Sequence, residues 1–162
     1  MIAAVLVNTS NLEEHAGNET LAVSNAQQAV AEARTVAEPV MLNQALTALA
    51  EHQAQAGQFD EAFKMFEEIE QLQLKANDKA NLASTRAERV TVLADAGRDK
   101  EADALAIATL ATLDAKSDPD NYGWLKLELA RQELDRKHFD PAQTLLDAAS
   151  GVVINAGDAE LG

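Results

Sequence analysis

The sequence predicts an all-α fold built from antiparallel helical hairpins, and three observations lead to this prediction. Alanine accounts for 33 of the 162 residues, and Leu, Glu and Gln, which also favour helices, are abundant. Aromatic residues make up only 4% of the chain, and a hydrophobic content of 47% is too high for a disordered protein. Glycine, alanine and acidic residues also recur at a constant interval of forty positions, which is typical of helical repeats.

One recurring column marks the turn inside each hairpin. Gly17, Gly57 and Gly97 follow one another at this forty-position interval, and glycine ends helices because it enters the left-handed region without steric cost. The fourth turn carries Lys137 at the same position. Five residues after each turn position stands an alanine that we expect to be buried where the two helices cross: Ala22, Ala62, Ala102 and Ala142.

A second column marks the start of each hairpin. An acidic residue occupies this position in all four repeats, and in two of them proline follows it. This pair starts helices, because the carboxylate caps free amides and proline fits the first helical position. The acidic residues are Glu38, Asp78, Asp118 and Asp158. The two columns divide the chain into units of about 1–37, 38–77, 78–117 and 118–157. After the first unit, the expected helices cover about 39–56, 60–76, 79–96, 100–115, 119–136 and 140–155.

Apolar residues within these segments follow helical spacing. In segment 60–76, Ala62, Phe66, Ile69 and Leu72 stand three or four positions apart, which places them on one face. In the last two segments we also expect a buried face, formed by Leu125, Leu129 and Leu134, and by Ala142, Leu146, Ala149 and Val153.

The second unit resembles the tetratricopeptide repeat (TPR) family. Each repeat of that family has a small residue in the first helix, a glycine at the turn, and an alanine and a large apolar residue in the second helix. The corresponding residues here are Ala50, Gly57, Ala62 and Phe66. The family period is usually about 34 residues, and the longer period here is similar to that of input modules in bacterial regulatory proteins. The resemblance implies a right-handed α-solenoid, a TPR-like superhelix, with residues 1–162 as a single repeat domain.

The register of the repeat indicates a segment of a longer array, with a natural short protein as the alternative. The first helix would be capped before Met1, and residues 157–161 repeat the register of a new helix start. Truncated arrays expose apolar faces at their ends, so we expect an end-to-end homodimer of the isolated chain. The residues expected at these ends are Ile2, Val5 and Leu6, and Val152, Val153 and Ile154.

Charge and composition disfavour several partners and settings. Thirteen Lys and Arg against 27 Asp and Glu give a net charge of −14, which repels nucleic acid phosphates and anionic membranes, so neither is an expected partner. The chain has no cysteine, which fits a cytoplasmic location. No apolar run approaches the length of a membrane span, and the apolar start lacks the basic residues of a signal peptide.

No catalytic or cofactor-binding motif is found, so we expect a protein that is not an enzyme and has no cofactor or metal. His15, His52 and His138 lack the spacing of paired metal ligands, and solvated or helix-capping roles are expected for them. Acidic runs such as Glu67-Glu68 are expected to form solvated helix faces.

Basic residues gather on the first helices of the last two hairpins, the helices that line the concave groove in TPR arrays. Arg86 and Lys126 occupy equivalent positions of successive repeats and are expected to be stacked neighbours; with Arg89 and Arg131 they form a candidate groove for a peptide carrying carboxylates. The alternative is that these residues form ion pairs with glutamates on the same helices.

Trp124 completes the candidate site. It stands near the start of the last of these helices and is either packed in the core, the favoured interpretation, or exposed as a binding anchor. Together these features predict a protein- or peptide-binding module, an input or scaffold region of a larger bacterial signalling or transcription-regulatory protein. A small-ligand sensor and a self-assembly module are the alternatives.

Overall fold

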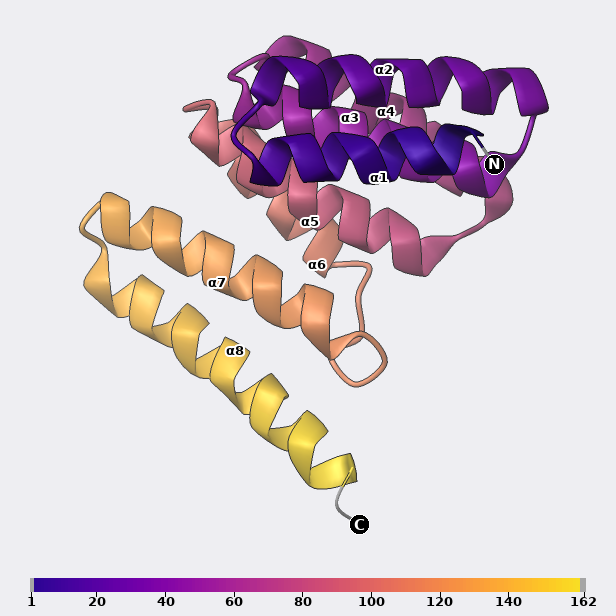
Figure 1. Cartoon of the computed structure of the whole chain (residues 1–162). Helices are drawn as coiled ribbons and strands as arrows, with labels where there is room; N and C mark the ends of the chain where they lie inside the picture. Colours follow the sequence, from indigo (N-terminus) through magenta and orange to yellow (C-terminus); the bar gives the residue numbers. More distant parts are fainter. Residues whose placement is uncertain (1, 161–162) are drawn as a thin grey trace. The chain divides into compact units, whose positions relative to one another are not determined.

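The computed structural model describes the backbone of residues 2–160 and the side chains of residues 2–151. Over this range the chain forms eight α-helices and no strand, each helix antiparallel to its hairpin partner (Figure 1). The fold is therefore an all-α helical-repeat fold, as the sequence predicted. The helices are α1 (Ile2–His15), α2 (Glu19–Val36), α3 (Pro39–Gln55), α4 (Phe59–Ala76), α5 (Lys79–Asp95), α6 (Asp99–Leu110), α7 (Pro119–Asp135) and α8 (Phe139–Glu160).

The helices divide into two compact units, Met1–Asp78 and Lys79–Gly162, each holding two hairpins. In the first unit, α2 packs against both α1 and α3, α4 packs against α3, and α1 also contacts α3. In the second unit, α5 pairs with α6 and α7 with α8, while α7 also contacts α5 and α6. Each hairpin thus buries its apolar face against its own second helix and against the neighbouring hairpin of the same unit.

The four hairpin turns share one hydrogen-bonding pattern, which recurs with the sequence repeat. At the second turn, the Gly57 amide donates to the carbonyl of Ala54 at 3.0 Å and the Gln58 amide donates to the carbonyl of Gln53 at 2.7 Å. The same pair of bonds closes the turns at Gly17, Gly97 and Lys137. This Schellman-type ending requires a left-handed residue, and all four turn residues have a positive φ, including Lys137 at 63°.

The alanines five residues after these turns are fully buried, with no exposed surface at Ala22, Ala62, Ala102 or Ala142. Each lies in the first turn of the second helix of a hairpin, where a larger side chain would hold the paired helices apart. Ala50 of α3 and Ala130 of α7, on the opposing helices, are also fully buried. Small residues on both helices therefore allow the close approach within these hairpins.

The sixth helix is shorter than the sequence predicted, because it ends at Leu110 instead of near residue 115. The Thr109 and Thr112 hydroxyls donate to the carbonyls of Leu105 and Thr109. Asp114 then closes a turn, since its carbonyl accepts from the amides of Ser117 and Asp118. Short polar side chains offer the backbone local bonds that compete with the helix, and helical periodicity alone did not reveal this competition.

The acidic helix starts are only partly as expected. Asp118 caps α7, because its Oδ1 accepts a hydrogen bond from the Asn121 amide at 3.3 Å. Glu38 precedes Pro39 at the start of α3 but makes no side-chain cap hydrogen bond. Glutamate is not among the favoured cap residues, and the proline sets the helix start there.

The left-handed turns predict opposite effects for two substitutions. Gly57→Ala is expected to lower the free energy of unfolding by about 1 kcal/mol, because an alanine at this positive φ is strained although no atom lies within 4 Å of the added Cβ. Lys137→Gly is expected to raise it, by up to about 1 kcal/mol, because the strain at φ 63° is relieved. Urea unfolding followed by circular dichroism measures both, and effects of the same sign would contradict the account.

The alanine column predicts that Ala62→Leu destabilises the first unit by roughly 1–3 kcal/mol, because the larger side chain overpacks a site without free space. Ala31→Leu on the exposed face of α2 is the matched control and is expected to change stability by less than about 0.5 kcal/mol. Equal unfolding midpoints for the two variants would show that the hairpin tolerates a large residue at position 62.

Candidate functional site

The exposed face of α7 carries a row of large apolar side chains with one arginine among them. Trp124 is 52% exposed, and Leu127 and Leu134 are also exposed on this helix. These residues and Arg131 stand at spacings of three, four and three, so they lie on one side of the helix. Solvent-facing side chains of this size in one row are typical of an interaction surface. We call Trp124, Leu127, Arg131 and Leu134 the α7 face.

Two expectations from the sequence are corrected here. Trp124 does not pack in the core, because the buried side of α7 is filled by Leu125, Leu129 and Ala130. Leu134 is also outside the core, although the sequence pattern grouped it with Leu125 and Leu129. Both residues were expected to be buried, and helical spacing alone does not distinguish a buried apolar residue from an exposed one.

Arg131 is held on this face by carboxylates. Its guanidinium donates two hydrogen bonds to Glu128, at 2.5 and 3.3 Å, and lies 3.8 Å from Asp135 and 4.0 Å from Asp95 of α5. The Glu128 hydrogen bond raises the pKa of Arg131. The same-helix pairing that the sequence offered as an alternative is thus observed for Arg131, and three carboxylates around one guanidinium leave the region acidic.

The five candidate residues lie on more than one side of α5 and α7. Lys126 is two residues from Trp124, a rotation of about 200° around the helix, and its Nζ lies 5.5 Å from the centroid of the Tyr122 ring. Arg86 occupies the equivalent position on α5, and both Arg86 and Arg89 are half-buried. Trp124 and Arg131 share the α7 face, whereas the other three residues do not belong to it.

A buried polar pair joins α1 to α3 in the first unit. His52 is buried, and its Nε2 lies 3.2 Å from Oγ of Ser10, which itself donates to the carbonyl of Val7. Because the Ser10 proton is used in that bond, the Nε2–H of a neutral imidazole is the donor to Ser10. Burial lowers the pKa of His52, and the nearby Glu14 carboxylate partly opposes this shift. The solvated or helix-capping role expected for this histidine is therefore wrong.

His52 predicts a pH-dependent stability of the first unit. Folding lowers the pKa of His52. The stability that its neutral imidazole contributes is therefore fully present above the unfolded pKa of about 6.5 and is lost as the pH falls below that value. We expect the free energy of unfolding of the protein, relative to His52→Gln, to fall between about pH 7 and pH 5. Urea titrations of both proteins at several pH values measure this difference, and a difference independent of pH would contradict it.

The other two histidines lie at hairpin turns and are exposed. Nδ1 of His138 lies 2.8 Å from Oε2 of Glu133, while Nδ1 of His15 lies 2.6 Å from the carbonyl of Asn11. Both contacts are local to a helix end, as expected for capping roles. Within the described residues, no group of three His, Asp or Glu side chains is placed to hold a metal ion, and no helix is long and apolar enough to cross a membrane.

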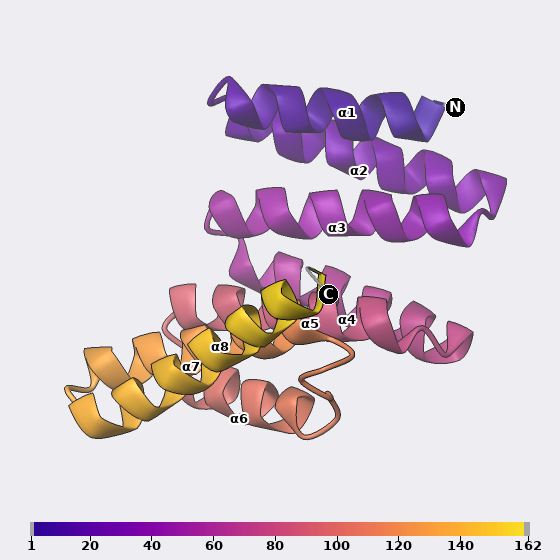
Figure 2. The ribbon, with the colours of Figure 1, turned by 90° about the horizontal axis from the view of Figure 1, so that it is seen from below.

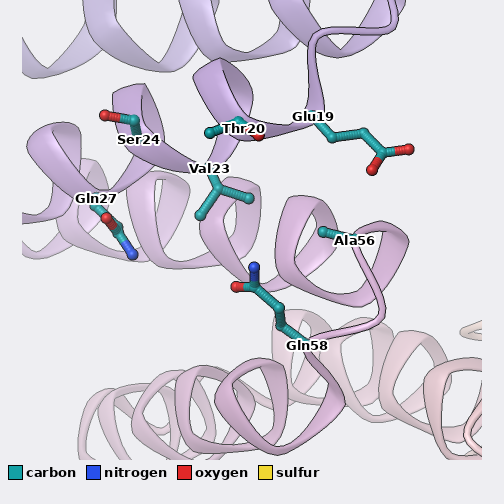
Figure 3. Close-up of a pocket in the computed structure, with 7 residues that line it drawn as sticks. All are labelled: Glu19, Thr20, Val23, Ser24, Gln27, Ala56 and Gln58. Carbon is teal, nitrogen blue, oxygen red and sulfur yellow. The ribbon is translucent and has the colours of Figure 1, made fainter.

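A polar recess of about 380 Å³ lies in the first unit, between the start of α2 and the turn that joins α3 to α4. Figure 3 shows Gln58 extending toward Val23, with Gln27 farther along α2. Hydroxyls, amides and one carboxylate line the recess. Its walls come from two hairpins, so the recess could not be predicted from the sequence. The lining residues are Glu19, Thr20, Val23, Ser24, Gln27, Ala56 and Gln58.

Solved structures with the same architecture are TPR-like repeat proteins. The chain superposes on kinesin-light-chain-type TPR-like repeats from Podosopora anserina with a TM-score of 0.76, at 20% identity, over 94% of this chain and 75% of that one. A single-substitution form of those repeats gives a TM-score of 0.78, at 20% identity, over 96% and 76% of the two chains.

The chain is also similar to BtubC (BKLC) from P. vanneervenii, with a TM-score of 0.80, at 15% identity, over 96% of this chain and 64% of that chain. No protein-family model and no curated protein matches the sequence. The likeness therefore shows a TPR-like helical-repeat fold.

Proposed function

We propose that this protein is a non-catalytic module that binds a protein or peptide segment through the α7 face. The observation that carries the proposal is the row of Trp124, Leu127 and Leu134, which stays solvent-exposed although the helix has a complete buried side. An exposed tryptophan flanked by leucines is the kind of anchor that dominates binding energy at interfaces.

The charges around the α7 face favour a partner segment that is apolar and basic. Arg131 is already surrounded by Glu128, Asp95 and Asp135, and the whole chain has a net charge of −14. An acidic peptide would have to displace these carboxylates from the guanidinium, whereas a basic residue beside the apolar anchors would add attraction. The partner in this proposal is an amphipathic segment with two or three apolar side chains and a net positive charge.

The wider role follows from the long-period resemblance. In this proposal the module works in the cytoplasm as an input or scaffold region of a larger bacterial signalling or transcription-regulatory protein. The absence of cysteine and the acidic surface support a cytoplasmic setting and a protein partner over nucleic acid or an anionic membrane.

A small-ligand sensor is the second candidate, because the recess of the first unit has a suitable size and lining. Its hydroxyls and amides offer donors and acceptors, with Glu19 as the charged group, so the ligand class would be polar and neutral or cationic.

Binding at the α7 face is testable with the protein's own fluorescence, because Trp124 is the single tryptophan of the chain. Amphipathic helical peptides of equal apolar content and of net positive, neutral or negative charge are titrated against the protein. We expect the positive peptides to bind most tightly, to shift the Trp124 emission to the blue as the ring is covered, and to weaken as salt is added.

Two variants locate the binding surface. Leu127→Ala is expected to weaken peptide binding by about tenfold or more, measured as anisotropy of a labelled peptide. Ile107→Ala removes an exposed apolar residue from α6 and is the matched control. Preference for negative peptides, or equal losses in the two variants, would contradict binding at the α7 face.

A further inference from the structure

The outer side of α1 carries a second apolar row, unrelated to the α7 face. Ile2, Val5, Thr9, Leu12 and Ala16 follow the spacing of three, four, three and four that forms the seam of a two-helix coiled coil. Val5 is 58% exposed and Leu12 is 70% exposed, and Ile2 is exposed as well. We call these five residues the α1 seam.

The polar atom in the α1 seam is already satisfied. The Thr9 hydroxyl donates to the carbonyl of Val5 at 2.8 Å, so only its methyl group needs a new partner. The first twelve residues contain no charged side chain, although the chain as a whole is strongly acidic. The seam therefore presents a surface that can be buried without leaving a charge or a hydroxyl unpaired.

In the next hairpin, residues at the positions equivalent to part of this side of α1 are buried by helix packing. One repeat after Val5, Leu6 and Thr9, the corresponding residues of α3 are Ala45, Leu46 and Leu49, and all three are buried. In this unit α1 and α2 pack against α3. Figure 2 shows α2 and α3 on one side of α1, so no helix of this unit covers its other side.

We propose that the α1 seam is a homotypic docking surface, on which a second copy of this chain packs its own α1 in the antiparallel direction. The seam is self-complementary in that direction, because Ile2 meets the second copy's Leu12 and Val5 meets its Thr9, each contact occurring twice. The larger Ile2–Leu12 pairs then lie at the two ends of the interface and the smaller Val5–Thr9 pairs at its centre, with the symmetry of a two-fold contact.

Charge also favours the antiparallel arrangement. Glu13 stands at the carboxyl end of α1, and in this arrangement it lies near the amino-terminal end of the partner helix, where exposed amides favour negative charge. A parallel pair would bring the two copies of Glu13 together. The described part of α8 does not offer a better match for the seam, because Gln143, Asp147 and Ser150 are exposed and polar there.

The dimer is expected to be weak. One pair of short helices buries less surface than a standard stable interface, so association in the micromolar range or weaker is expected. The proposed dimer differs from the end-to-end contact predicted from the sequence. That contact also used Val152, Val153 and Ile154, and the side chains of these three residues lie outside the described residues. The proposal uses α1 alone and does not depend on the α7 face.

Sedimentation equilibrium of the full chain tests the dimer. We expect the apparent mass to approach twice that of the chain as the concentration rises to about 1 mM, and Val5→Glu to remain monomeric. Val40→Glu changes a valine on α3 that is 65% exposed and lies outside the α1 seam. It adds the same charge and is expected to dimerise like the unaltered protein. A monomer at all concentrations, or equal loss in both variants, would overturn the proposal.

Leu12→Gln is the companion variant, because it weakens the seam without adding charge and at an exposed position where folding is little affected. We expect it to be folded by circular dichroism and monomeric over the same range. A folded Leu12→Gln protein that dimerises as strongly as the unaltered chain would show that the contact lies elsewhere.

Cysteine cross-linking tests the direction, and the chain has no cysteine to interfere. A mixture of Ile2→Cys and Leu12→Cys proteins is expected to form a disulfide-linked dimer on mild oxidation, because a disulfide needs Cα atoms within about 7 Å. The Ile2→Cys protein alone is expected to remain uncross-linked, since the two copies of residue 2 lie at opposite ends of the interface. Cross-linking of Ile2→Cys to itself and not to Leu12→Cys would overturn the antiparallel arrangement.

Discussion

The fold depends on one constraint, which is that the two helices of each hairpin approach closely directly after a left-handed turn. The turn residue reverses the chain with two backbone hydrogen bonds. The alanine five positions later then lies at the crossing point with no exposed surface. Because both requirements recur in every repeat, each hairpin presents similar faces to its neighbours, and the array grows by repetition.

This constraint also decides where function can reside. The buried sides of the helices are committed to hairpin pairing and to packing on the next hairpin, so binding must use the sides that remain. On α7 that remaining side carries Trp124 and two leucines, and on α1 it carries a coiled-coil seam. The first surface is bordered by carboxylates, which favours a basic segment, whereas the second is uncharged and matches its own copy.

Buried polar groups add a further contribution to the packing of the first unit. His52 and Ser10 link α1 to α3 across a site where the other repeats have no histidine. This environment favours the neutral imidazole, because burial lowers the pKa of His52. The packing of these two helices is therefore tied to the protonation state of one side chain, while the rest of the core is formed mostly by alanine, leucine and valine.

The sequence by itself determined the all-α class, the hairpin turns and the buried alanine column, because these follow from local backbone geometry repeated at a fixed period. It also contained both exposed rows, but periodicity cannot distinguish a buried apolar row from an exposed one. Trp124 and Leu134 were grouped with core residues, and His52 with solvated ones, for this reason. Only the tertiary structure decided whether these residues are buried or exposed, since burial depends on which side of a helix the neighbouring hairpin covers.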